Sequence, residues 1–347
     1  MVRHIGIVSL SAGVIGEASV RHEVEIGLAR LKDYGIQVSM MPHAMSGIAY
    51  VKDHPKERAE DLLQALQDPS IDMILCAVGG DDTYRLLPYL FDHEELAKAA
   101  QPKIFLGFSD TTINHLMFHR IGFPTFYGQA FLPDVCELEP QMLPYSKRYF
   151  EELIRTGTIH KITPSDVWYD ERTDWSAKAA GTGRVSHPNE GFRLLQGEPV
   201  FSGEILGGCI ESLFDLFDST RYAGSAGLCQ AYGLFPPAAD WQGKILLLET
   251  CEELSSPAHY RLMLETLGKT GVFDAVSGIL CGKPMNGKYQ AEYEHIIVET
   301  VGRRDFPIVS NINIGHATPR CIIPFGVPAV VNAGLQEITF SGRGLLG

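Results

Sequence analysis

The chain has 347 residues, which is long for a single hydrophobic core and predicts two domains. Apolar residues make up 45% and charged residues 20%, an ordinary globular balance, and the formal net charge is −13. An acidic surface repels phosphates, so neither a nucleic acid polymer nor an anionic membrane is expected as a partner, and no apolar run approaches the length that spans a bilayer.

The beginning of the chain and its cysteines predict a cytoplasmic protein. Residues 1–10 lead directly into a strand-like run, without the order of segments found in a signal peptide. The 7 cysteines are odd in number and scattered, and no Cys-x-x-Cys pair or zinc-site signature occurs.

Gly79-Gly80-Asp81 lacks the spacing of a dinucleotide fingerprint, and no phosphate-binding Gly-Lys-Ser/Thr loop is present. We therefore expect no cofactor and no metal.

Strand and helix patterns alternate over the first 120 residues. Short apolar runs predict strands, and apolar residues at helical spacing predict helices. The predicted elements are, in chain order, strand Ile5–Ser9, a helix carrying Val20, Val24, Leu28 and Leu31, strand Ile36–Met41, helix Lys56–Leu66, strand Met73–Val78, helix Thr83–Leu90, strand Ile104–Phe108 and a helical run through Phe118. This alternation predicts an α/β fold with a mainly parallel sheet and helices on both faces.

The rest of the chain predicts a second domain after a crossing segment. From about Thr163 to Gly203 the sequence is polar and rich in glycine and proline, with Trp168 and Trp175, which is typical of an inter-domain crossing with a binding loop. Short strands follow at Gly203–Leu206, Lys244–Glu249, Gly278–Gly282, Ile308–Asn311, Ala329–Val331 and Ile338–Phe340, with one helix at Ala258–Gly268. We expect a smaller, β-rich α+β domain, with boundaries at 1–165, 166–202 and 203–347.

The segment from Met73 to Leu90 is the most informative for function. Its apolar run predicts a buried strand, Gly79-Gly80 allows a sharp turn, and a helix is predicted to begin at Asp81-Asp82-Thr83. Hydrolases present a nucleophilic hydroxyl at such a strand–turn–helix junction, where free N–H groups can receive an oxyanion. The alternative is a helix N-cap without catalytic meaning. Ligand sites lie beyond the carboxyl ends of parallel strands, so Gly79–Thr83 and Ser109–Thr112 could line one crevice.

Two further residues have the chemistry of a hydrolase. Glu249 ends an apolar strand, and His316 follows another strand and a glycine. Histidine is the natural general base near neutral pH, but the chain has 12 histidines and strand-end carboxylates are often simply exposed. His115 and His119 stand four apart, yet no third metal ligand accompanies them, so a packed or solvated helix face is the better interpretation.

These segments together resemble the LD-carboxypeptidase family of serine peptidases, and most closely its microcin-immunity (MccF-like) branch. The resemblance rests on the order of His54–Leu63, Gly79–Leu90, Gly107-Phe-Ser-Asp-Thr-Thr112, Trp168 with Asp170-Glu171, Gly203–Gly208, Ile245–Glu249 and Gly315-His316. It implies cytoplasmic hydrolysis of an amide bond near a terminal carboxyl group in a small peptide, a muropeptide or a peptide–nucleotide conjugate. It also implies a homodimer.

The resemblance also implies roles for particular residues. The family uses a Ser, Glu and His set, and by motif we expect Thr83, Glu249 and His316 in these roles. The N–H groups of Tyr84 and Gly80 are expected to receive the oxyanion. The remaining expected site residues bind substrate: Trp168, which would stack on a planar group such as a nucleobase, Asp110 and Ser109.

The sequence departs from the family in two segments. Gly-Gly-Asp-Asp-Thr stands where the family shows Gly-Gly-x-x-Ser, and Gly207–Ser212 reads Gly-Gly-Cys-Ile-Glu-Ser where Gly-Gly-Asn-Leu is usual. Threonine keeps the hydroxyl but adds a methyl group that crowds a tight turn, and Asp81-Asp82 adds negative charge beside it. A working threonine nucleophile, a slowed enzyme and a non-catalytic binding protein for small peptides or nucleotide conjugates are therefore all open. A periplasmic-type binding module or a nicotinamide-dependent oxidoreductase fits the motifs less well.

Overall fold

The computed structural model describes residues 1–342, which fold into two compact units. The first comprises Met1–Thr158 and Arg172–Arg184, and the second comprises Ile159–Glu171 and Val185–Gly342. The predicted crossing segment, 166–202, is therefore divided between the units instead of standing apart. The units have comparable lengths, so the second is not the smaller domain that the sequence suggested.

A parallel sheet forms the centre of the first unit. Its strands are β1 (His4–Val8), β2 (Gln37–Met40), β3 (Met73–Cys76), β4 (Ile104–Gly107) and β5 (Thr125–Tyr127). They lie in the order β5-β4-β3-β1-β2, and each neighbouring pair is parallel. Strands β1, β3 and β4 are buried along their whole length, as expected for strands covered on both faces. The predicted parallel α/β architecture is confirmed.

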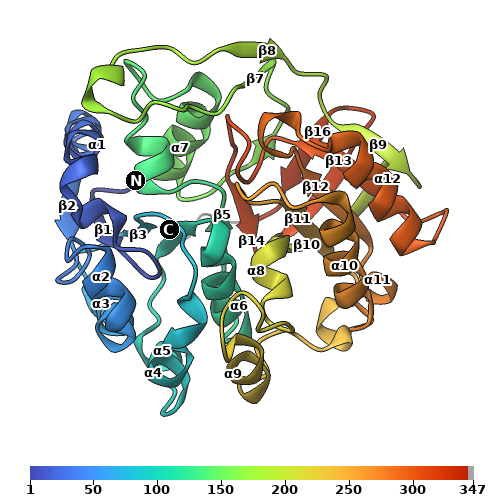
Figure 1. The fold of residues 1–347 in the computed structure, drawn as a ribbon, viewed down its shortest axis with the longest axis horizontal. Coiled ribbons are helices and arrows are strands. Elements are labelled where there is room, and N and C mark those ends of the chain that lie inside the picture. The colour runs from blue at the N-terminus through green and yellow to red at the C-terminus, as the bar shows by residue number, and fades with distance from the viewer. Residues whose placement is uncertain (343–347) are drawn as a thin grey trace. The chain divides into compact units, whose positions relative to one another are not determined.

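The connections of the first unit are mostly helical (Figure 1). The helices are α1 (Arg21–Asp33), α2 (Ile48–Asp53), α3 (Pro55–Gln67), α4 (Leu87–Phe91), α5 (Glu95–Ala99), α6 (Thr112–Arg120) and α7 (Pro144–Thr156). The helix expected from Thr83 to Leu90 is instead a 3-10 turn, Thr83–Leu86, followed by α4. Pro88 lacks an N–H group and cannot continue one α-helical ladder through this segment.

A mixed sheet forms the centre of the second unit. Its order is β6-β16-β15-β10-β11-β12-β13-β9, in which β10 to β13 are parallel to one another and the outer strands are antiparallel. The strands of this unit are β6 (Lys161–Ile162), β7 (Val167–Tyr169), β8 (Ser186–Pro188), β9 (Arg193–Gln196), β10 (Val200–Cys209), β11 (Ile245–Glu249), β12 (Gly278–Gly282), β13 (Ile308–Ile312), β14 (Ile323–Phe325), β15 (Pro328–Asn332) and β16 (Glu337–Phe340). β7 and β8 form a separate antiparallel pair.

Helices accompany the second sheet: α8 (Ile210–Phe214), α9 (Ser225–Ala231), α10 (Pro257–Gly268), α11 (Val272–Ala275) and α12 (Gln290–Val301). α10 packs against α12 (Figure 1). Between these helices the rings of Tyr260 and Tyr293 stack with centroids 4.3 Å apart. The expected β-rich second domain is confirmed. No helix within residues 1–342 has both the length and the apolar character needed to cross a membrane.

Candidate active site

The turn after β3 holds Thr83 in a buried hydrogen-bond network. The side chain of Thr83 has no exposed surface, and its hydroxyl donates to Asp110 Oδ2 at 2.7 Å. The Thr83 N–H group donates to the same oxygen at 3.0 Å, and the Ser11 hydroxyl does so at 2.6 Å. A hydroxyl that is fully enclosed and committed to a carboxylate cannot meet a substrate carbonyl. The expectation that Thr83 stands clear of the sheet as a nucleophile is therefore wrong for this structure.

The two acidic residues beside Thr83, Asp81 and Asp82, make local contacts. Asp82 accepts hydrogen bonds from the guanidinium groups of Arg58 at 2.5 Å and Arg85 at 2.9 Å. The Asp82 N–H group donates to the Ser11 hydroxyl at 3.2 Å, and the Asp81 N–H group does so at 2.7 Å. The negative charge of Asp82 thus lies within ion pairs, and the N–H groups of Asp81 and Asp82 hold the turn against Ser11.

Asp110 organises this turn and is not a free substrate ligand. Its Oδ2 atom accepts from the Thr83 hydroxyl, the Thr83 N–H group and the Ser11 hydroxyl, and the residue is 6% exposed. Burial raises the pKa of Asp110 above its usual value, although its hydrogen bonds to Ser11 and Thr83 oppose that shift. We infer that Asp110 joins the turns after β3 and β4, which differs from the substrate-binding role expected for it.

Ser109 has the backbone conformation of a strained functional turn. It follows β4 at the start of a short 3-10 turn, Ser109–Thr111, that leads into α6, and its φ is +64°. A non-glycine residue in this left-handed region costs roughly 1–2 kcal/mol, and such strain concentrates at functional sites. The Thr112 hydroxyl donates to the Ser109 carbonyl at 2.7 Å, and the Ser109 N–H donates to the Tyr127 hydroxyl at 3.2 Å. Ser109, which the sequence suggested only as a substrate contact, occupies the strand–turn–helix junction expected for Thr83.

The glycines after β3 allow this turn to approach Ser109 closely. A Cβ atom on Gly79 would lie 2.6 Å from the Ser109 Cβ, which real structures do not tolerate. Gly80 has a φ of +150°, and a Cβ there would lie 2.4 Å from the Ser11 hydroxyl. The sequence singled out Gly79-Gly80 for turn formation, and the structure adds that both positions have no room for a side chain.

Glu249 and His316 form a charged hydrogen bond in the second unit. Glu249 is the last residue of β11, and its side chain is fully buried. Its Oε2 atom accepts from His316 Nδ1 at 2.8 Å and from the His316 backbone N–H at 3.3 Å. Gly315 has a φ of +83°, and a Cβ there would lie 2.3 Å from the same carboxylate oxygen. The structure thus brings together two residues that stand 67 positions apart, as the sequence suggested.

A second carboxylate contacts the other ring nitrogen of His316. Glu252 Oε2 lies 3.1 Å from His316 Nε2, and the Glu252 side chain is 65% exposed. Burial alone would lower the pKa of His316, but Glu249 and Glu252 outweigh it and raise the pKa well above its usual value. The hydrogen bond to His316 lowers the pKa of Glu252 to about 2. Both ring nitrogens of His316 thus lie within hydrogen-bond reach of a carboxylate oxygen, and sequence reasoning missed Glu252 because an exposed acidic turn gives no signal.

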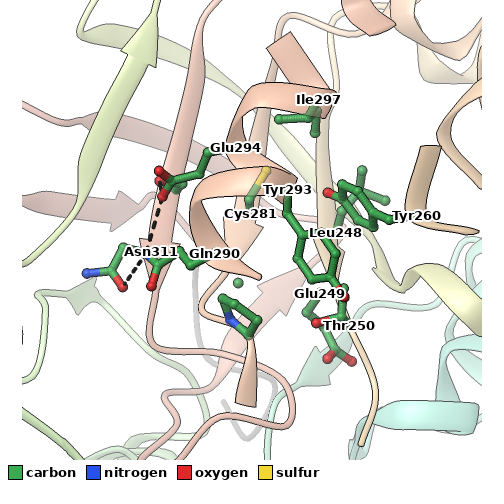
Figure 2. A pocket seen from close by; sticks show the side chains of 13 residues that line it. Leu248, Glu249, Thr250, Tyr260, Cys281, Gln290, Tyr293, Glu294, Ile297 and Asn311 are labelled. Atoms are coloured by element: carbon green, nitrogen blue, oxygen red, sulfur yellow. Dashed lines mark hydrogen bonds between the residues drawn. The ribbon is translucent and has the colours of Figure 1, made fainter. Parts of the chain in front are cut away.

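A cavity beside Glu249 is too small for a substrate. Figure 2 shows Leu248, Thr250, Tyr260 and Tyr293 around it together with Glu249. Its size is that of a water molecule. The hydroxyl of Thr250 is buried there without a hydrogen-bond partner. We assign this cavity to the packing around the buried Glu249 carboxylate.

Trp168 lies in a small stack of side chains within the second unit. Its ring stacks on His187 with centroids 4.3 Å apart, and the Lys283 ammonium group lies 5.0 Å from its centroid. His187 Nε2 lies 2.9 Å from Asp170 Oδ1, which fixes the imidazole ring. Trp168 is half-buried, so the ring is held in place by neighbours and retains some accessible surface.

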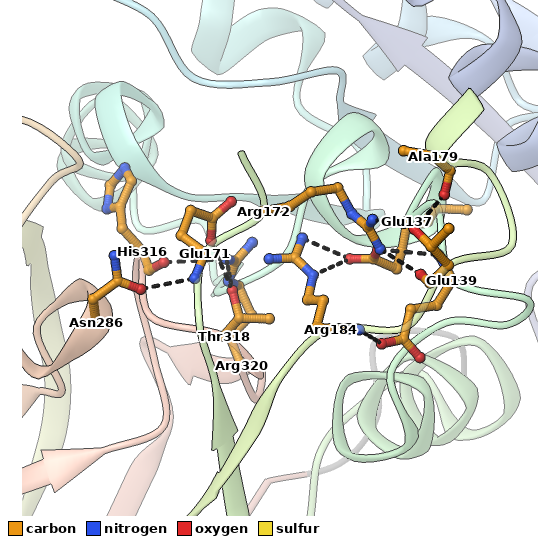
Figure 3. A network of polar contacts seen from close by, with 12 residues as sticks. Glu137, Glu139, Glu171, Arg172, Ala179, Arg184, Asn286, His316, Thr318 and Arg320 are labelled. Atoms are coloured by element: carbon orange, nitrogen blue, oxygen red, sulfur yellow. Dashed lines mark hydrogen bonds and ion pairs between the residues drawn. The ribbon is translucent and has the colours of Figure 1, made fainter. Parts of the chain in front are cut away.

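Polar contacts anchor the chain on both sides of the boundary between residues 171 and 172. In the first unit, buried Glu137 accepts from Arg172 at 3.2 Å and from Arg184 at 2.9 Å (Figure 3). These cations lower the pKa of Glu137 below its usual value, although burial opposes them. In the second unit, the Glu171 N–H donates to Asn286 Oδ1 at 2.7 Å (Figure 3). Each side of the chain is thus anchored to its own unit.

The comparison with protein families decides the identity of the scaffold. Residues 5–128 match the LD-carboxypeptidase N-terminal domain, and residues 202–331 match the LD-carboxypeptidase C-terminal domain. The chain belongs to the LD-carboxypeptidase family. Ser109 and Thr83 lie in the first of these domains, and Glu249 and His316 lie in the second.

Relatives of the chain include proteins from both branches of this family. The microcin C7 self-immunity protein MccF of Escherichia coli is 25% identical over 82% of this chain and 78% of MccF. The murein tetrapeptide carboxypeptidase of Pseudomonas aeruginosa is 25% identical over 89% of this chain and 88% of that enzyme.

Solved structures place the chain near the MccF-like branch. An MccF-like protein from Streptococcus pneumoniae in complex with AMP is 58% identical, with a TM-score of 0.97 over 98% of this chain and 99% of that one. Two structures of MccF are each 23% identical over 98% of this chain and 96% of theirs, and with TM-scores of 0.77 and 0.79 they share the fold. One contains aspartyl sulfamoyl adenosine, and the other is an active-site mutant in which a serine, an asparagine and a lysine are changed to alanine.

Proposed function

We propose that this protein is a serine-type hydrolase that cleaves an acyl–nitrogen bond beside a carboxyl group, in an aminoacyl–nucleotide conjugate or a muropeptide. The observation that carries the proposal is the Glu249–His316 hydrogen bond of 2.8 Å at a fully buried carboxylate, because a histidine oriented by a buried acid is the general-base half of a hydrolytic triad. Membership of a carboxypeptidase family supports this chemistry.

We assign the nucleophile to Ser109 in place of Thr83. The left-handed serine after β4 has the geometry of a nucleophile elbow, whereas the Thr83 hydroxyl is enclosed and donates to Asp110. The active-site serine of MccF agrees with a serine nucleophile. The threonine in the turn after β3 then carries no catalytic cost, which removes the main reason to favour a non-catalytic binding protein.

The proposed reaction follows the triad logic. The hydroxyl of Ser109 attacks the acyl carbon, and its proton passes to Nε2 of His316 while Glu249 stabilises the imidazolium. The nitrogen leaving group takes that proton, and water then hydrolyses the acyl ester with the same base. The N–H group of Asp110, the residue after the nucleophile, and that of Gly80 are the proposed oxyanion donors, each worth roughly 3–4 kcal/mol. Tyr84 was expected as an oxyanion donor because it follows Thr83, so with Ser109 as nucleophile it is no longer proposed as a donor. Ser109 belongs to the first unit and His316 to the second. The hypothesis requires the Ser109 hydroxyl to reach Nε2 of His316 during turnover.

Substrate choice is proposed from Trp168 and the relatives. The AMP bound to the Streptococcus pneumoniae protein and the aspartyl sulfamoyl adenosine bound to MccF favour a nucleotide conjugate over a muropeptide. A base stacked on Trp168 would gain about 1–3 kcal/mol. We expect Trp168→Ala to raise KM for aspartyl sulfamoyl adenosine by tenfold or more, and to leave KM for a murein tetrapeptide almost unchanged.

The central experiment identifies the acylated residue. Wild-type protein is mixed with aspartyl sulfamoyl adenosine, quenched during turnover and digested, and the acylated peptide is found by mass spectrometry. We expect acylation of the peptide that contains Ser109, complete loss of product with Ser109→Ala and His316→Ala, and residual turnover with Thr83→Val. Acylation of Thr83, or full activity of Ser109→Ala, would refute the assignment. Tight binding without product in the wild type would instead identify a binding protein.

The cytoplasmic location and the homodimer also remain proposals from the resemblance. Sedimentation of the purified chain tests the dimer, and fractionation of cells tests the location.

A further inference from the structure

Three side chains that can bind a metal lie together at the ends of β10 and β11. One ligand atom from each of Cys209, Glu211 and Cys251 lies within 4.8 Å of the other two, and all three residues are buried. The parallel pairing of the two strands places Cys209 opposite Glu249, and Cys251 follows Glu249 by two residues. Glu211 lies in the first turn of α8, directly after β10.

The carboxylate in this cluster is buried among neutral donors. Glu211 accepts from the Cys209 thiol at 3.3 Å, from the Cys251 N–H at 3.0 Å and from the Ser255 hydroxyl at 3.0 Å. Within residues 1–342, no lysine, arginine or histidine forms an ion pair with Glu211. Burying a carboxylate costs free energy unless a cation or sufficient hydrogen bonds compensate it. The cluster therefore holds an acid and two thiols, and its carboxylate has no ion pair with a protein cation among the described residues.

We propose that Cys209, Glu211 and Cys251 bind a zinc ion. Two thiolates and one carboxylate are donors that zinc accepts, whereas calcium and magnesium prefer oxygen alone. In a tetrahedral site with Zn–S bonds of about 2.3 Å, the two sulfur atoms would lie about 3.8 Å apart. The cluster needs to contract by no more than about 1 Å to reach that geometry. Three protein ligands leave the fourth position for a water molecule or a small anion.

Charge and access are both compatible with this site. When zinc replaces the two thiol protons, the summed charge of the cluster stays the same, so binding adds no net charge to the protein interior. Glu211 also lines a pocket together with Asp215, Arg221 and His259, so the carboxylate side of the cluster borders a cavity.

Sequence patterns alone could not indicate this site. Cys209 and Glu211 belong to the segment that departs from the usual Gly-Gly-Asn-Leu, and Cys251 lies 42 residues beyond Cys209. The register of β10 and β11 brings Cys209 and Cys251 together, so no Cys-x-x-Cys pair marks the cluster in the sequence.

The test uses the purified, reduced, metal-free full chain. Titration with Co²⁺, a spectroscopic substitute for zinc, is followed by the thiolate-to-cobalt charge-transfer absorption, and Zn²⁺ is then used to displace it. We expect one equivalent of metal in the wild type and at least a hundredfold weaker binding in the Cys209→Ser/Cys251→Ser double variant. Cys281→Ser removes another buried thiol of the same sheet from outside the cluster, and it is expected to bind as the wild type does.

A second measurement does not depend on the folding of the variants. Alkylation of wild-type cysteines, followed residue by residue with mass spectrometry, is expected to slow at Cys209 and Cys251 when Zn²⁺ is added, and to be unchanged at Cys281. Metal binding without the charge-transfer band, equal binding by the double variant, or uniform alkylation with and without Zn²⁺ would each overturn the proposal. None of these readouts involves hydrolysis, so failure here is distinct from failure of the proposed function.

Discussion

The two carboxylates that contact His316 give a quantitative test of the role of burial. Glu249 lies 2.8 Å from Nδ1 and Glu252 lies 3.1 Å from Nε2, so the distances are similar. Their surroundings differ, because the Glu249 side chain is fully buried and the Glu252 side chain is 65% exposed. Glu249→Gln and Glu252→Gln each remove one negative charge and change little else in size. The pair of variants therefore separates the effect of burial from that of distance.

The expected losses differ by at least a hundredfold. Two opposite charges about 4 Å apart attract by about 4 kcal/mol at an effective dielectric constant of about 20. Loss of that stabilisation from the imidazolium in the transition state corresponds to about a thousandfold in kcat. An amide in place of the triad carboxylate of a serine protease costs about ten thousandfold, because it also permits the wrong tautomer. For Glu249→Gln we therefore expect a loss between these values. Solvent screens Glu252, so Glu252→Gln should change kcat by about fivefold or less.

The assay is the release of aspartate from aspartyl sulfamoyl adenosine, measured for wild type and both variants at saturating substrate. Circular dichroism and thermal unfolding establish that each variant is folded. Comparable losses in the two variants, or a loss below about tenfold for Glu249→Gln, would show that the buried carboxylate does not stabilise the imidazolium. The triad interpretation would then be wrong even if the protein is a hydrolase.

Three further predictions concern His316 and its contacts with Glu249 and Glu252. Because the general base must be neutral, kcat/KM should rise with pH through the elevated pKa of His316, and Glu252→Gln should move that rise to lower pH in a pH–rate profile. The pKa of His316 in the folded protein lies above its unfolded value, so the stabilisation by Glu249 is fully present below about pH 6.5 and is lost as pH rises through the folded pKa. In urea unfolding, the difference in free energy of unfolding between wild type and Glu249→Gln should therefore shrink as pH rises. Gly315→Ala should cost at least about 1–2 kcal/mol of stability and lower kcat, because alanine is strained at its φ of +83° and its Cβ would meet the Glu249 carboxylate. The control Gly227→Ala has open space around it within α9, so in thermal unfolding and activity assays it should raise stability by about 0.5–1 kcal/mol and leave kcat unchanged.

The elements of the fold were largely predictable from local patterns. Runs such as Met73–Val78 and Ile245–Glu249 are apolar because their strands are covered, and helices such as α3 and α10 show the helical spacing of apolar residues. The break between the 3-10 turn and α4 was missed, although Pro88 signals it. The second unit was expected to be smaller because residues 166–202 were set apart as a crossing segment, whereas the structure places 166–171 and 185–202 in that unit.

The comparison of Thr83 with Ser109 shows the limit of local sequence patterns. Thr83 and Ser109 both follow a strand and precede a helical turn, so their local patterns are nearly equivalent. Only the tertiary structure shows that the Thr83 hydroxyl donates to Asp110, whereas Ser109 takes the left-handed conformation. Hydrogen-bond partners and backbone angles depend on the neighbouring strand, which no local window contains.

The sequence by itself determined the parallel α/β architecture and the family, and it singled out Glu249 and His316 as a candidate pair, because periodicity and short motifs are local properties of a chain. The tertiary structure decided what those residues contact. The second carboxylate on His316, the neutralised charge of Asp82 and the cluster of Cys209, Glu211 and Cys251 all join distant segments, and strand register is what brings such segments together.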